Sequence, residues 1–340
     1  MIIRSKAPLR LGLAGGGTDV SPYSDMFGGA VLNATVSLYA YATIEPREDN
    51  KIVIRSIDKA STIESSSAQI LEIDGHLDLI KGVYNRIIRD YKIKPLSFTL
   101  TTFVDAPAGS GMGSSSTLVT AVLGAFSEWL KLPLGEYDLA KLAYQIERTD
   151  LGMAGGKQDQ YAATFGGINF MEFYDNGKVI VNPLRIKDQV LNELSNNIIL
   201  FYTKTSRISS EIIENQQRNV NTGSVKSVEA MHKLKELAVN MKEAILKGKL
   251  DMMGQLLNLS WEYKKQMADG ITNPLIDRIY TTAVEAGATG GKISGAGGGG
   301  FMFFYCPGIT RYNVINALEQ FGGHARRYEF TRQGLETWTF

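Results

Sequence analysis

The pattern of hydrophobic and polar positions predicts strands and helices that are mixed along the chain without strict alternation. Residues 30–45 are rich in β-branched and aromatic side chains, and 51–57 alternates between apolar and polar positions, as strands do. Apolar residues recur at helical spacing over 78–92 and over 135–150. The other elements predicted in this half are a strand at 97–104, a helix at 114–130 and a hairpin around Asp175–Gly177.

The second half of the chain is predicted to be richer in helices. A crossover near 182–195 leads into predicted helices at 225–246, 249–267, 274–286 and 311–321 and predicted strands at 197–202, 301–306 and 325–330. This mixture predicts an α+β fold rather than a parallel doubly wound sheet. Because 340 residues are enough for about two domains, we expect a two-domain protein.

Composition and charge narrow the function classes. With 44% hydrophobic and 21% charged residues the chain has an ordinary globular composition. A net charge of +1, without basic runs, argues against a nucleic-acid partner. No apolar run is long enough to cross a bilayer or resembles a signal peptide. The single cysteine excludes an intrachain disulfide. We therefore expect a cytoplasmic protein, without a membrane partner, whose proton acceptor is a carboxylate because its histidines are few and scattered.

A glycine-rich loop between a predicted strand and a predicted helix is the first candidate site. Gly109, Gly111 and Gly113 precede a helix beginning at Ser114, and free N–H groups at a helix N-terminus bind phosphate. No lysine follows as in a Walker A loop, the spacing is not that of a Rossmann fingerprint, and a Gly-x-Ser-x-Gly elbow is absent. On this loop alone, a tight turn that only caps a helix is an alternative interpretation.

Two further glycine-bearing segments lie at 5–19 and 290–301. Glycine in regular structure is destabilising by about 0.5–1 kcal/mol, so such runs usually accompany a close approach of the backbone to another group. A flexible linker is the alternative for 290–301. The strongly strand-like segment directly behind it argues against a linker.

The three segments together resemble the motifs of the GHMP small-molecule kinases. Motif one is similar to Lys6-Ala-Pro-Leu-Arg10 through Thr18-Asp19, motif two to Pro107–Ser115 with Met112 in place of leucine, and motif three to Lys292–Gly300. The resemblance implies a kinase that uses ATP and Mg²⁺. It also implies a two-domain fold: an N-terminal ATP-binding domain (1–190) like domain 2 of ribosomal protein S5, and a ferredoxin-like C-terminal domain (191–340).

The resemblance also implies roles for individual residues. Asp159 would face the attacking hydroxyl, as a base or only to orient it, and Arg10 would pair with Asp159 or steady the transferring phosphoryl group. Ser115 and Glu147 would bind Mg²⁺. Taken alone, Glu147 would be a solvated helix residue, Asp159 a turn or capping residue, and Arg10 a strand residue covering apolar surface. The residues expected to bind ATP are Pro107, Gly109, Ser110, Gly111, Met112, Gly113, Ser114, Ser115 and Ser116.

The acceptor is expected to be a sugar phosphate. Galactokinases carry Gly-Glu-His-Thr-Asp at the end of motif one, whereas this chain has Gly15-Gly-Gly-Thr-Asp19, which leaves room for a bulkier sugar. The N-terminal segment is most similar to that of bacterial D-glycero-D-manno-heptose 7-phosphate kinases, which phosphorylate O1 with ATP on the route to GDP-heptose. Expected substrate-binding residues are Gly16, Gly17, Thr18, Asp19, Gly297 and Arg207.

Several questions stay open at this stage. The acceptor's phosphate needs cations, for which Arg4, Lys6, Lys157 and Lys204 are candidates beside Arg207. A fucokinase- or galactokinase-like enzyme for an unphosphorylated sugar is the alternative function. A non-catalytic sugar- or nucleotide-binding regulator is disfavoured, because Arg10, Glu147 and Asp159 are all present. Beyond sugar phosphate and ATP, the expected partner is a second copy of the chain in a homodimer.

Overall fold

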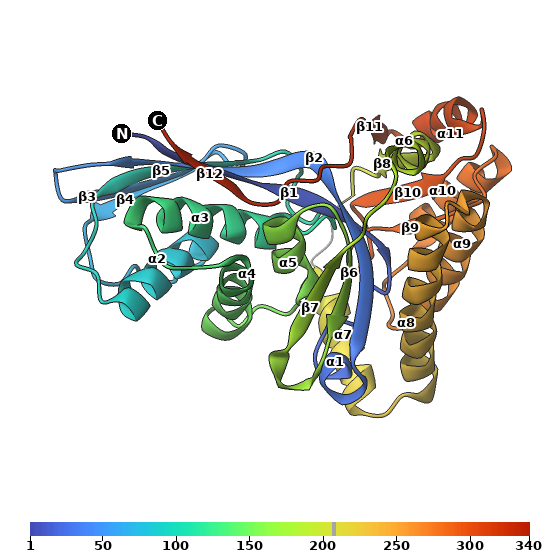
Figure 1. Cartoon of the computed structure of the whole chain (residues 1–340), viewed down its shortest axis with the longest axis horizontal. Coiled ribbons are helices and arrows are strands. Elements are labelled where there is room, and N and C mark those ends of the chain that lie inside the picture. The colour runs from blue at the N-terminus through green and yellow to red at the C-terminus, as the bar shows by residue number, and fades with distance from the viewer. Residues whose placement is uncertain (206–208) are drawn as a thin grey trace.

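The computed structural model describes residues 1–205 and 209–340 and contains two sheets (Figure 1). The strands are β1 (Ile3–Ala14), β2 (Gly29–Pro46), β3 (Lys51–Ser56), β4 (Ser61–Ser66), β5 (Phe98–Val104), β6 (Ile168–Phe173), β7 (Val179–Pro183), β8 (Ile198–Tyr202), β9 (Gly290–Ile293), β10 (Phe301–Tyr305), β11 (His324–Arg326) and β12 (Glu336–Thr339). The α-helices are α1 (Tyr23–Phe27), α2 (Asp78–Tyr91), α3 (Ser114–Leu130), α4 (Glu136–Gln145), α5 (Gln158–Phe165), α6 (Asp188–Asn197), α7 (Ser209–Asn221), α8 (Val225–Leu246), α9 (Met253–Lys264), α10 (Pro274–Glu285) and α11 (Arg311–Leu318). Short 3₁₀ turns occur at Asp175–Gly177, Leu250–Met252 and Glu319–Phe321, and a π-helical turn at Ile146–Asp150.

The larger sheet has eight strands in the order β12-β1-β2-β5-β3-β4, with β6 and β7 attached to the other end of the long strand β2. Its pairs are antiparallel except β3 with β5. Helices α2, α3, α4 and α5 lie along one side of this sheet (Figure 1). β12 returns the C-terminus to β1, where Ile2 and Phe340 exchange backbone hydrogen bonds of 2.8 and 2.9 Å. This arrangement places the start of α3 beside the middle of β1.

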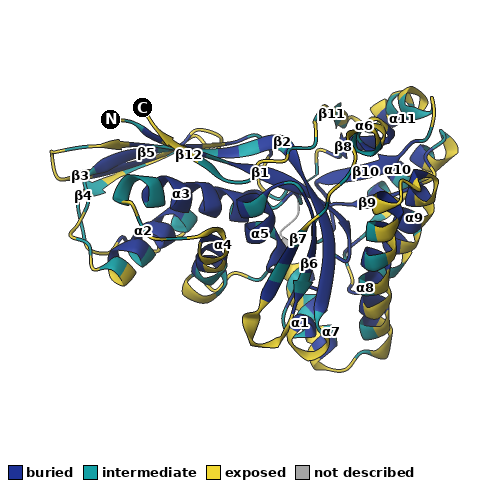
Figure 2. Cartoon of the chain, in the orientation of Figure 1, coloured by how far each residue is buried: buried dark blue, intermediate teal, exposed yellow. Residues whose placement is uncertain are grey.

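The smaller sheet has four antiparallel strands in the order β11-β8-β10-β9. Helix α9 packs on β9, and α8 packs on both α9 and β2. Buried side chains of β1, β2 and α3 form one core cluster that continues into α8, α9 and β10, and a second cluster surrounds Trp261 and Phe304. Figure 2 shows the central strands buried and the outer helix faces exposed. The cleft described below therefore rests on a continuous apolar support.

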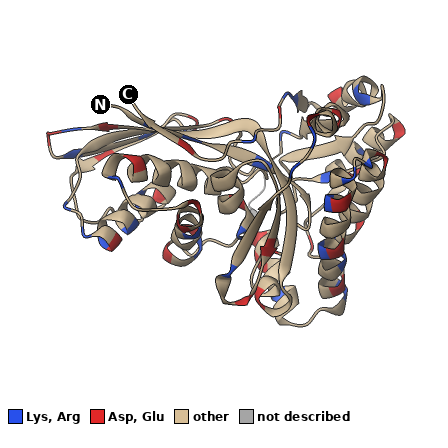
Figure 3. Cartoon of the chain, in the orientation of Figure 1, with Lys and Arg blue, Asp and Glu red and all other residues tan. Residues whose placement is uncertain are grey.

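Acidic and basic residues are interspersed along the helices (Figure 3). On α8, for example, Lys233 pairs with Glu236 at 3.0 Å, and Glu243 pairs with the C-cap residue Lys247 at 2.6 Å. None of the helices in the described ranges combines the length and apolar character that spanning a membrane requires. Positive and negative charges are thus mixed along the helices, and over the whole chain they nearly cancel to a net charge of +1.

The α+β prediction is confirmed, while several element predictions need correction. The helices predicted at 114–130 and 225–246 are α3 and α8, and the hairpin around Asp175–Gly177 joins β6 and β7. The strand predicted at 325–330 is shorter, because β11 ends at Arg326 and residues 327–330 contribute an isolated bridge, from Phe330 to Val36. The helix predicted at 249–267 is shorter, because a 3₁₀ turn precedes α9 and turns follow it.

Candidate active site

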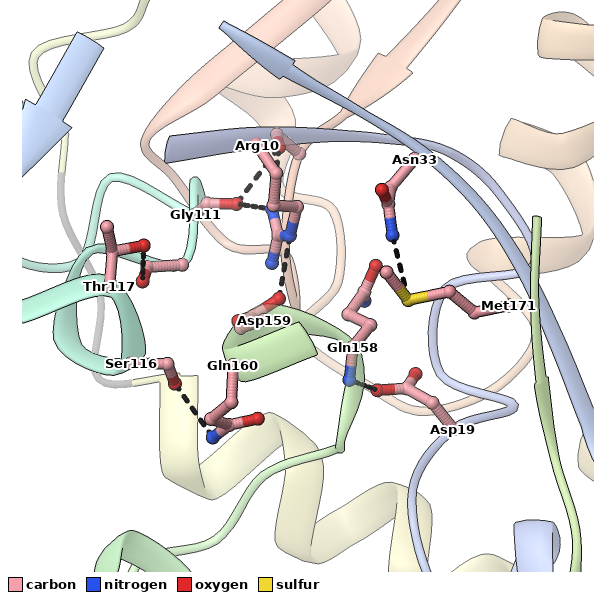
Figure 4. A network of polar contacts seen from close by, with 12 residues as sticks. Arg10, Asp19, Asn33, Gly111, Ser116, Thr117, Gln158, Asp159, Gln160 and Met171 are labelled. Atoms are coloured by element: carbon pink, nitrogen blue, oxygen red, sulfur yellow. Dashed lines mark hydrogen bonds and ion pairs between the residues drawn. The ribbon is translucent and has the colours of Figure 1, made fainter. Parts of the chain in front are cut away.

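Strand β1 carries Arg10 to the centre of the molecule. Its side chain is almost fully buried, and its Nε donates a 2.7 Å hydrogen bond to Oδ1 of Asp159, in the first turn of α5. Its Nη1 donates to the carbonyl of Gly111 at 2.6 Å and to Oγ of Ser294 at 3.3 Å (Figure 4). Charge-assisted hydrogen bonds of this kind are stronger than neutral ones. One guanidinium therefore joins all three glycine-bearing regions of the site to α5.

The glycine-rich loop presents the N-terminus of α3 to the same place. Gly113 is the N-cap residue, with φ of +76°, and no side chain caps the helix. The first turn contains no acidic residue, so its N–H groups and the positive end of the helix dipole are available to an anion. A Cβ on Gly113 would also lie 3.0 Å from Cγ of Asp159. Glycine is needed here for both conformation and space.

The loop before α3 packs directly against the loop after β9. Gly111 has φ of +78°, and a Cβ there would collide with the carbonyl of Ser294. A Cβ on Gly295 would lie 2.6 Å from Cα of Gly111. Oγ of Ser294 donates to the Gly111 carbonyl at 2.9 Å. The glycines in both loops thus permit two backbones to meet, which a linker would not require.

Glu147 lies on the π-helical turn that ends α4, a feature often found at functional sites. Its side chain is fully buried; Oε2 accepts a hydrogen bond from Gln160, and Oε1 has no partner among the described residues. Burial raises the pKa of this carboxyl, opposed mainly by the nearby guanidinium of Arg148, which is 3.9 Å away. An enclosed carboxylate oxygen without a partner is suited to bind a cation that enters with a ligand.

The donor set around Glu147 fits Mg²⁺ better than a metal held by the protein alone. Ser116 accepts a 3.0 Å hydrogen bond from Gln160, the same amide that donates to Glu147, and Ser115 lines the adjacent cleft. Within the described ranges no three His, Cys, Asp or Glu side chains converge to hold a metal. Mg²⁺ is usually bound by one or two protein ligands together with water and substrate phosphates.

Asp19 lies in the loop that follows β1, where two hydrogen bonds hold its carboxylate. Its Oδ1 accepts from the backbone N–H of Gly17 at 3.1 Å. Its Oδ2 accepts from the backbone N–H of Gln158 at 3.0 Å (Figure 4). Burial raises the pKa of Asp19, partly offset by these hydrogen bonds. A Cβ on Gly156 would collide with the Asp19 carboxylate. The surroundings of Asp19 thus fix its carboxylate at the wall of the cleft.

A cleft of about 650 Å³ connects these groups. The predicted residues that line it are Arg10, Gly16, Gly17, Asp19, Gly109, Gly111, Gly113, Ser114, Ser115, Ser116, Glu147 and Asp159. The predicted residues outside its lining are Pro107, Ser110, Met112, Thr18 and Gly297. Thr18 donates to the carbonyls of Gly15 and Ala30, Met112 is a core residue, and Gly297 packs on Ile271. Arg207 lies outside the described residues.

The other proposed cations are also absent from the cleft lining, as far as the described ranges show. Lys6 pairs with Glu336 at 2.6 Å, and Lys157 pairs with Asp25 at 3.3 Å. Arg4 and Lys204 are exposed. The structure instead places two buried lysines in the lining, Lys264 from α9 and Lys292 from β9, together with Gln158 and Arg148. Sequence reasoning gave these four no role, since their burial results from packing between distant segments.

Comparison with known proteins matches both halves of the chain. The model of the GHMP kinases N-terminal domain matches residues 78–167, and that of the GHMP kinases C-terminal domain matches 241–324. A D-glycero-alpha-D-manno-heptose 7-phosphate kinase from Campylobacter jejuni is 51% identical over 99% of this chain and 98% of its own length. The chain belongs to the GHMP kinase family. The family resemblance and the family's two-domain fold are thereby confirmed.

Solved structures agree with membership of the GHMP kinases. A structure described as a D-glycero-D-manno-heptose 1-phosphate kinase from Bacteroides thetaiotaomicron superimposes with a TM-score of 0.86, at 46% identity over 99% of each chain. Lactococcus lactis galactokinase shares the fold, with a TM-score of 0.79 at 20% identity, over 98% of this chain and 95% of its own. GHMP kinases use ATP as the phosphate donor.

Proposed function

We propose that this GHMP kinase transfers the γ-phosphoryl group of ATP to the anomeric O1 of D-glycero-D-manno-heptose 7-phosphate, giving the 1,7-bisphosphate for GDP-heptose synthesis. Two relatives of 51% and 46% identity support it. The name of the first gives the proposed acceptor, and the second is described as a D-glycero-D-manno-heptose 1-phosphate kinase, so both names contain a heptose phosphate. The observation that carries the kinase chemistry is the Arg10–Asp159 ion pair at the uncapped N-terminus of α3.

On the donor side, the triphosphate would lie along the amides of Gly109–Ser116, at the positive end of α3. Mg²⁺ would be bound by Glu147 and the hydroxyl of Ser115, with Ser116 close by, and would neutralise phosphate charge. Of these residues, all but Ser110 and Met112 line the same cleft. Because phosphoryl transfer passes through a loose transition state, positioning and charge neutralisation supply most of the catalysis.

On the acceptor side, O1 would lie against Asp159. The O1–H proton passes to the Asp159 carboxylate while the O1–P bond forms, the bond from the γ-phosphorus to its bridging oxygen breaks, and ADP leaves. Arg10 fixes Asp159 through its 2.7 Å bond and presents positive charge to the transferring group. Asp19 would accept sugar hydroxyls, while Gly16 and Gly17, which lack side chains, would leave room for the longer carbon chain of a heptose.

The deciding experiment measures ADP release with ATP and a panel of heptose 7-phosphate, heptose, fucose, galactose and mannose, and locates the new phosphate by ³¹P NMR. We expect heptose 7-phosphate to be the best acceptor and the product to carry phosphate at C1. Activity on free sugars alone would replace this proposal by the alternative of an unphosphorylated-sugar kinase. ADP release that no sugar stimulates would favour a regulator.

Three further features belong to the proposal. The division into 1–190 and 191–340 falls within α6, which leads from the larger sheet into β8 of the smaller one, and limited proteolysis would test it. A homodimer is testable by sedimentation. A cytoplasmic location follows from the need for ATP and agrees with the single buried cysteine, Cys306; cell fractionation tests it.

A further inference from the structure

Two buried lysines lie in the wall of the cleft, and the proposed chemistry leaves them without a role. Lys264 is the last residue of α9 and is 4% exposed; Lys292 is in β9 and is 2% exposed. Both line the cleft with Arg10. Lysine is almost never this deeply buried unless its charge is paired. Such a concentration of basic groups raises the question of which anion they meet.

The two lysines differ in their own contacts. Lys292 Nζ has two weak acceptors, the carbonyl of Leu13 at 3.4 Å and Oγ of Ser260 at 3.3 Å. Lys264 makes no side-chain hydrogen bond to the described residues, and neither ammonium has a carboxylate within 4 Å among them. A buried ammonium without a counter-ion is strongly destabilising. Lys264 is therefore the group that a bound anion would satisfy.

The position of Lys264 assigns it to the acceptor end of the cleft. Met267, three residues after Lys264, packs on Gly17 of the acceptor loop, where an added Cβ would lie 2.4 Å from the Met267 methyl carbon. The neighbouring Lys292 contacts Leu13, in the strand that leads to the Gly15–Asp19 loop. The triphosphate site at the start of α3 already has its own donors in the loop amides. A second anion site at the acceptor end serves a charge on the sugar.

We propose that Lys264, supported from behind by Lys292, binds the phosphate group that the acceptor sugar already carries. This inference rests on the proposed function, because it names the group that recognises a phosphorylated acceptor. Lys264 donates from its ammonium to the phosphate oxygens, while Asp19 accepts from the sugar hydroxyls. Gly16 and Gly17, which line the same cleft, leave the space between them open. The cations expected from the sequence within the described ranges lie outside this lining.

The test compares three variants on two acceptors. Lys264→Met removes the ammonium and keeps a similar shape, whereas Lys264→Arg keeps a positive charge. Lys265→Met is the control, because it makes the same change one residue later, where Lys265 pairs with Glu262 at 2.9 Å and does not line the cleft. Acceptors are heptose 7-phosphate and the same heptose without phosphate. We expect K264M to raise KM for the phosphorylated sugar about 10- to 100-fold, the range for a hydrogen bond to a charged group. KM for ATP and kcat/KM for free heptose should change less than twofold, as should every constant of K265M.

The outcomes separate this inference from the proposed function. If the wild-type enzyme does not use heptose 7-phosphate, the proposed function fails whatever the variants do. If it does, and K264M weakens both acceptors equally, Lys264 binds hydroxyls and the inference is overturned. A fall in kcat with unchanged KM would place Lys264 on the transferring group and overturn it as well. Should K264M fail to fold, K264R decides: retained preference for the phosphorylated sugar supports the inference, and lost preference with intact thermal stability opposes it.

Proton uptake gives a second measurement that a merely structural lysine would not affect. Burial, with a smaller contribution from the Arg10 charge and opposed by Asp19, lowers the pKa of Lys264 to about 8. Burial and the charges of Lys264 and Arg10 lower the pKa of Lys292 as well. A bound phosphate favours the charged ammonium. Titration of inorganic phosphate at pH 8.5, with a non-hydrolysable ATP analogue filling the donor site, should therefore take up protons. Calorimetry in two buffers measures this uptake; K264M should reduce it, and an unchanged uptake would contradict the inference.

Discussion

The substitution Asp159→Asn tests the centre of the proposed mechanism, because it removes the acceptor of the hydroxyl proton and preserves the shape of the side chain. The amide oxygen of asparagine can still accept the 2.7 Å hydrogen bond from Arg10 Nε. Asp159 also lies against Gly113, where a larger side chain would have no room. The cleft and the triphosphate site should therefore keep their geometry in this variant.

The expected loss is in turnover. General base catalysis contributes about 10²- to 10⁴-fold, which corresponds to about 2.7–5.5 kcal/mol in the activation free energy. Arg10, whose side chain is 4% exposed, also loses its counter-ion. We expect this loss to destabilise the fold by up to about 3 kcal/mol, the upper end of the range for a hydrogen bond to a charged group. The affinity for ATP should stay within about threefold, since the amides that receive the triphosphate are unchanged.

The assay combines kcat from ADP release at 25 °C, Kd for a non-hydrolysable ATP analogue, and thermal unfolding. Asp188→Asn is the matched control, because Asp188 makes an exposed ion pair with Arg332 and neither residue lines the cleft. It should leave all three quantities nearly unchanged. A kcat for D159N within tenfold of the wild type would refute the assignment of Asp159 as base. A kcat loss accompanied by an equal loss of ATP affinity would show instead that the donor site had been distorted.

Three further predictions address the metal, the loop contact and pH. Glu147→Gln should raise the Mg²⁺ concentration for half-maximal rate at least about tenfold, and a Mg²⁺ titration of E147Q that matches the wild type would exclude Glu147 as a ligand. Because burial raises the pKa of Glu147, the wild type should also lose Mg²⁺ affinity as the pH falls through that raised pKa. Gly111→Ala should lower the free energy of unfolding by more than about 2 kcal/mol, because the added Cβ combines a positive φ with a collision with the Ser294 carbonyl. The control Gly177→Ala should lower it by only about 1 kcal/mol, because Gly177 has φ of +73° and nothing within 4 Å of the added Cβ. Equal losses of the two variants in chemical denaturation would refute the contact. Between the folded pKa of Lys264, about 8, and its ordinary value of 10.5, the unfolded state binds more protons than the folded state. The contribution of Lys264 to stability should therefore rise with pH across that window. The melting temperature of K264M should depend less steeply on pH than that of the wild type, and an identical slope would contradict this prediction.

The elements that the sequence predicted well are those whose pattern is local. α3 and α8 are long, and their apolar residues recur at helical spacing, so the sequence and the structure agree on their bounds. β1 was not predicted. It is buried over most of its length and contains Lys6, Arg10 and Gly12, so its sequence shows no alternation. β12 is short, partly exposed and at a sheet edge, where the sequence carries little hydrophobic signal.

The candidate site also contains residues that the sequence reveals and residues that only the structure reveals. The glycines of the phosphate loop could be found from the sequence because glycine at positive φ before a helix is a local requirement. Their resemblance to a family motif then pointed to Arg10, Glu147 and Asp159, which the structure brings to one cleft. Lys264 could not be found in this way. It ends an ordinary helix and precedes a partly buried lysine, and the packing of α9 against β9 buries it in the cleft wall with Arg10.

The contacts between glycines also explain why the site needs both halves of the chain. The carbonyl of Gly111 is bound by Arg10 from β1 and by Ser294 from the loop after β9. The amide of Phe301 donates to the carbonyl of Ser110 at 2.9 Å, in a place where a Cβ on Gly300 would collide with that carbonyl. Hydrogen bonds from Ser294 and Phe301 to these carbonyls fix the position of the loop that carries the phosphate-binding amides. The two donors lie almost 200 positions later in the chain than the loop. The C-terminal glycine motif therefore shapes the phosphate site by supporting the loop, whether or not it touches a ligand.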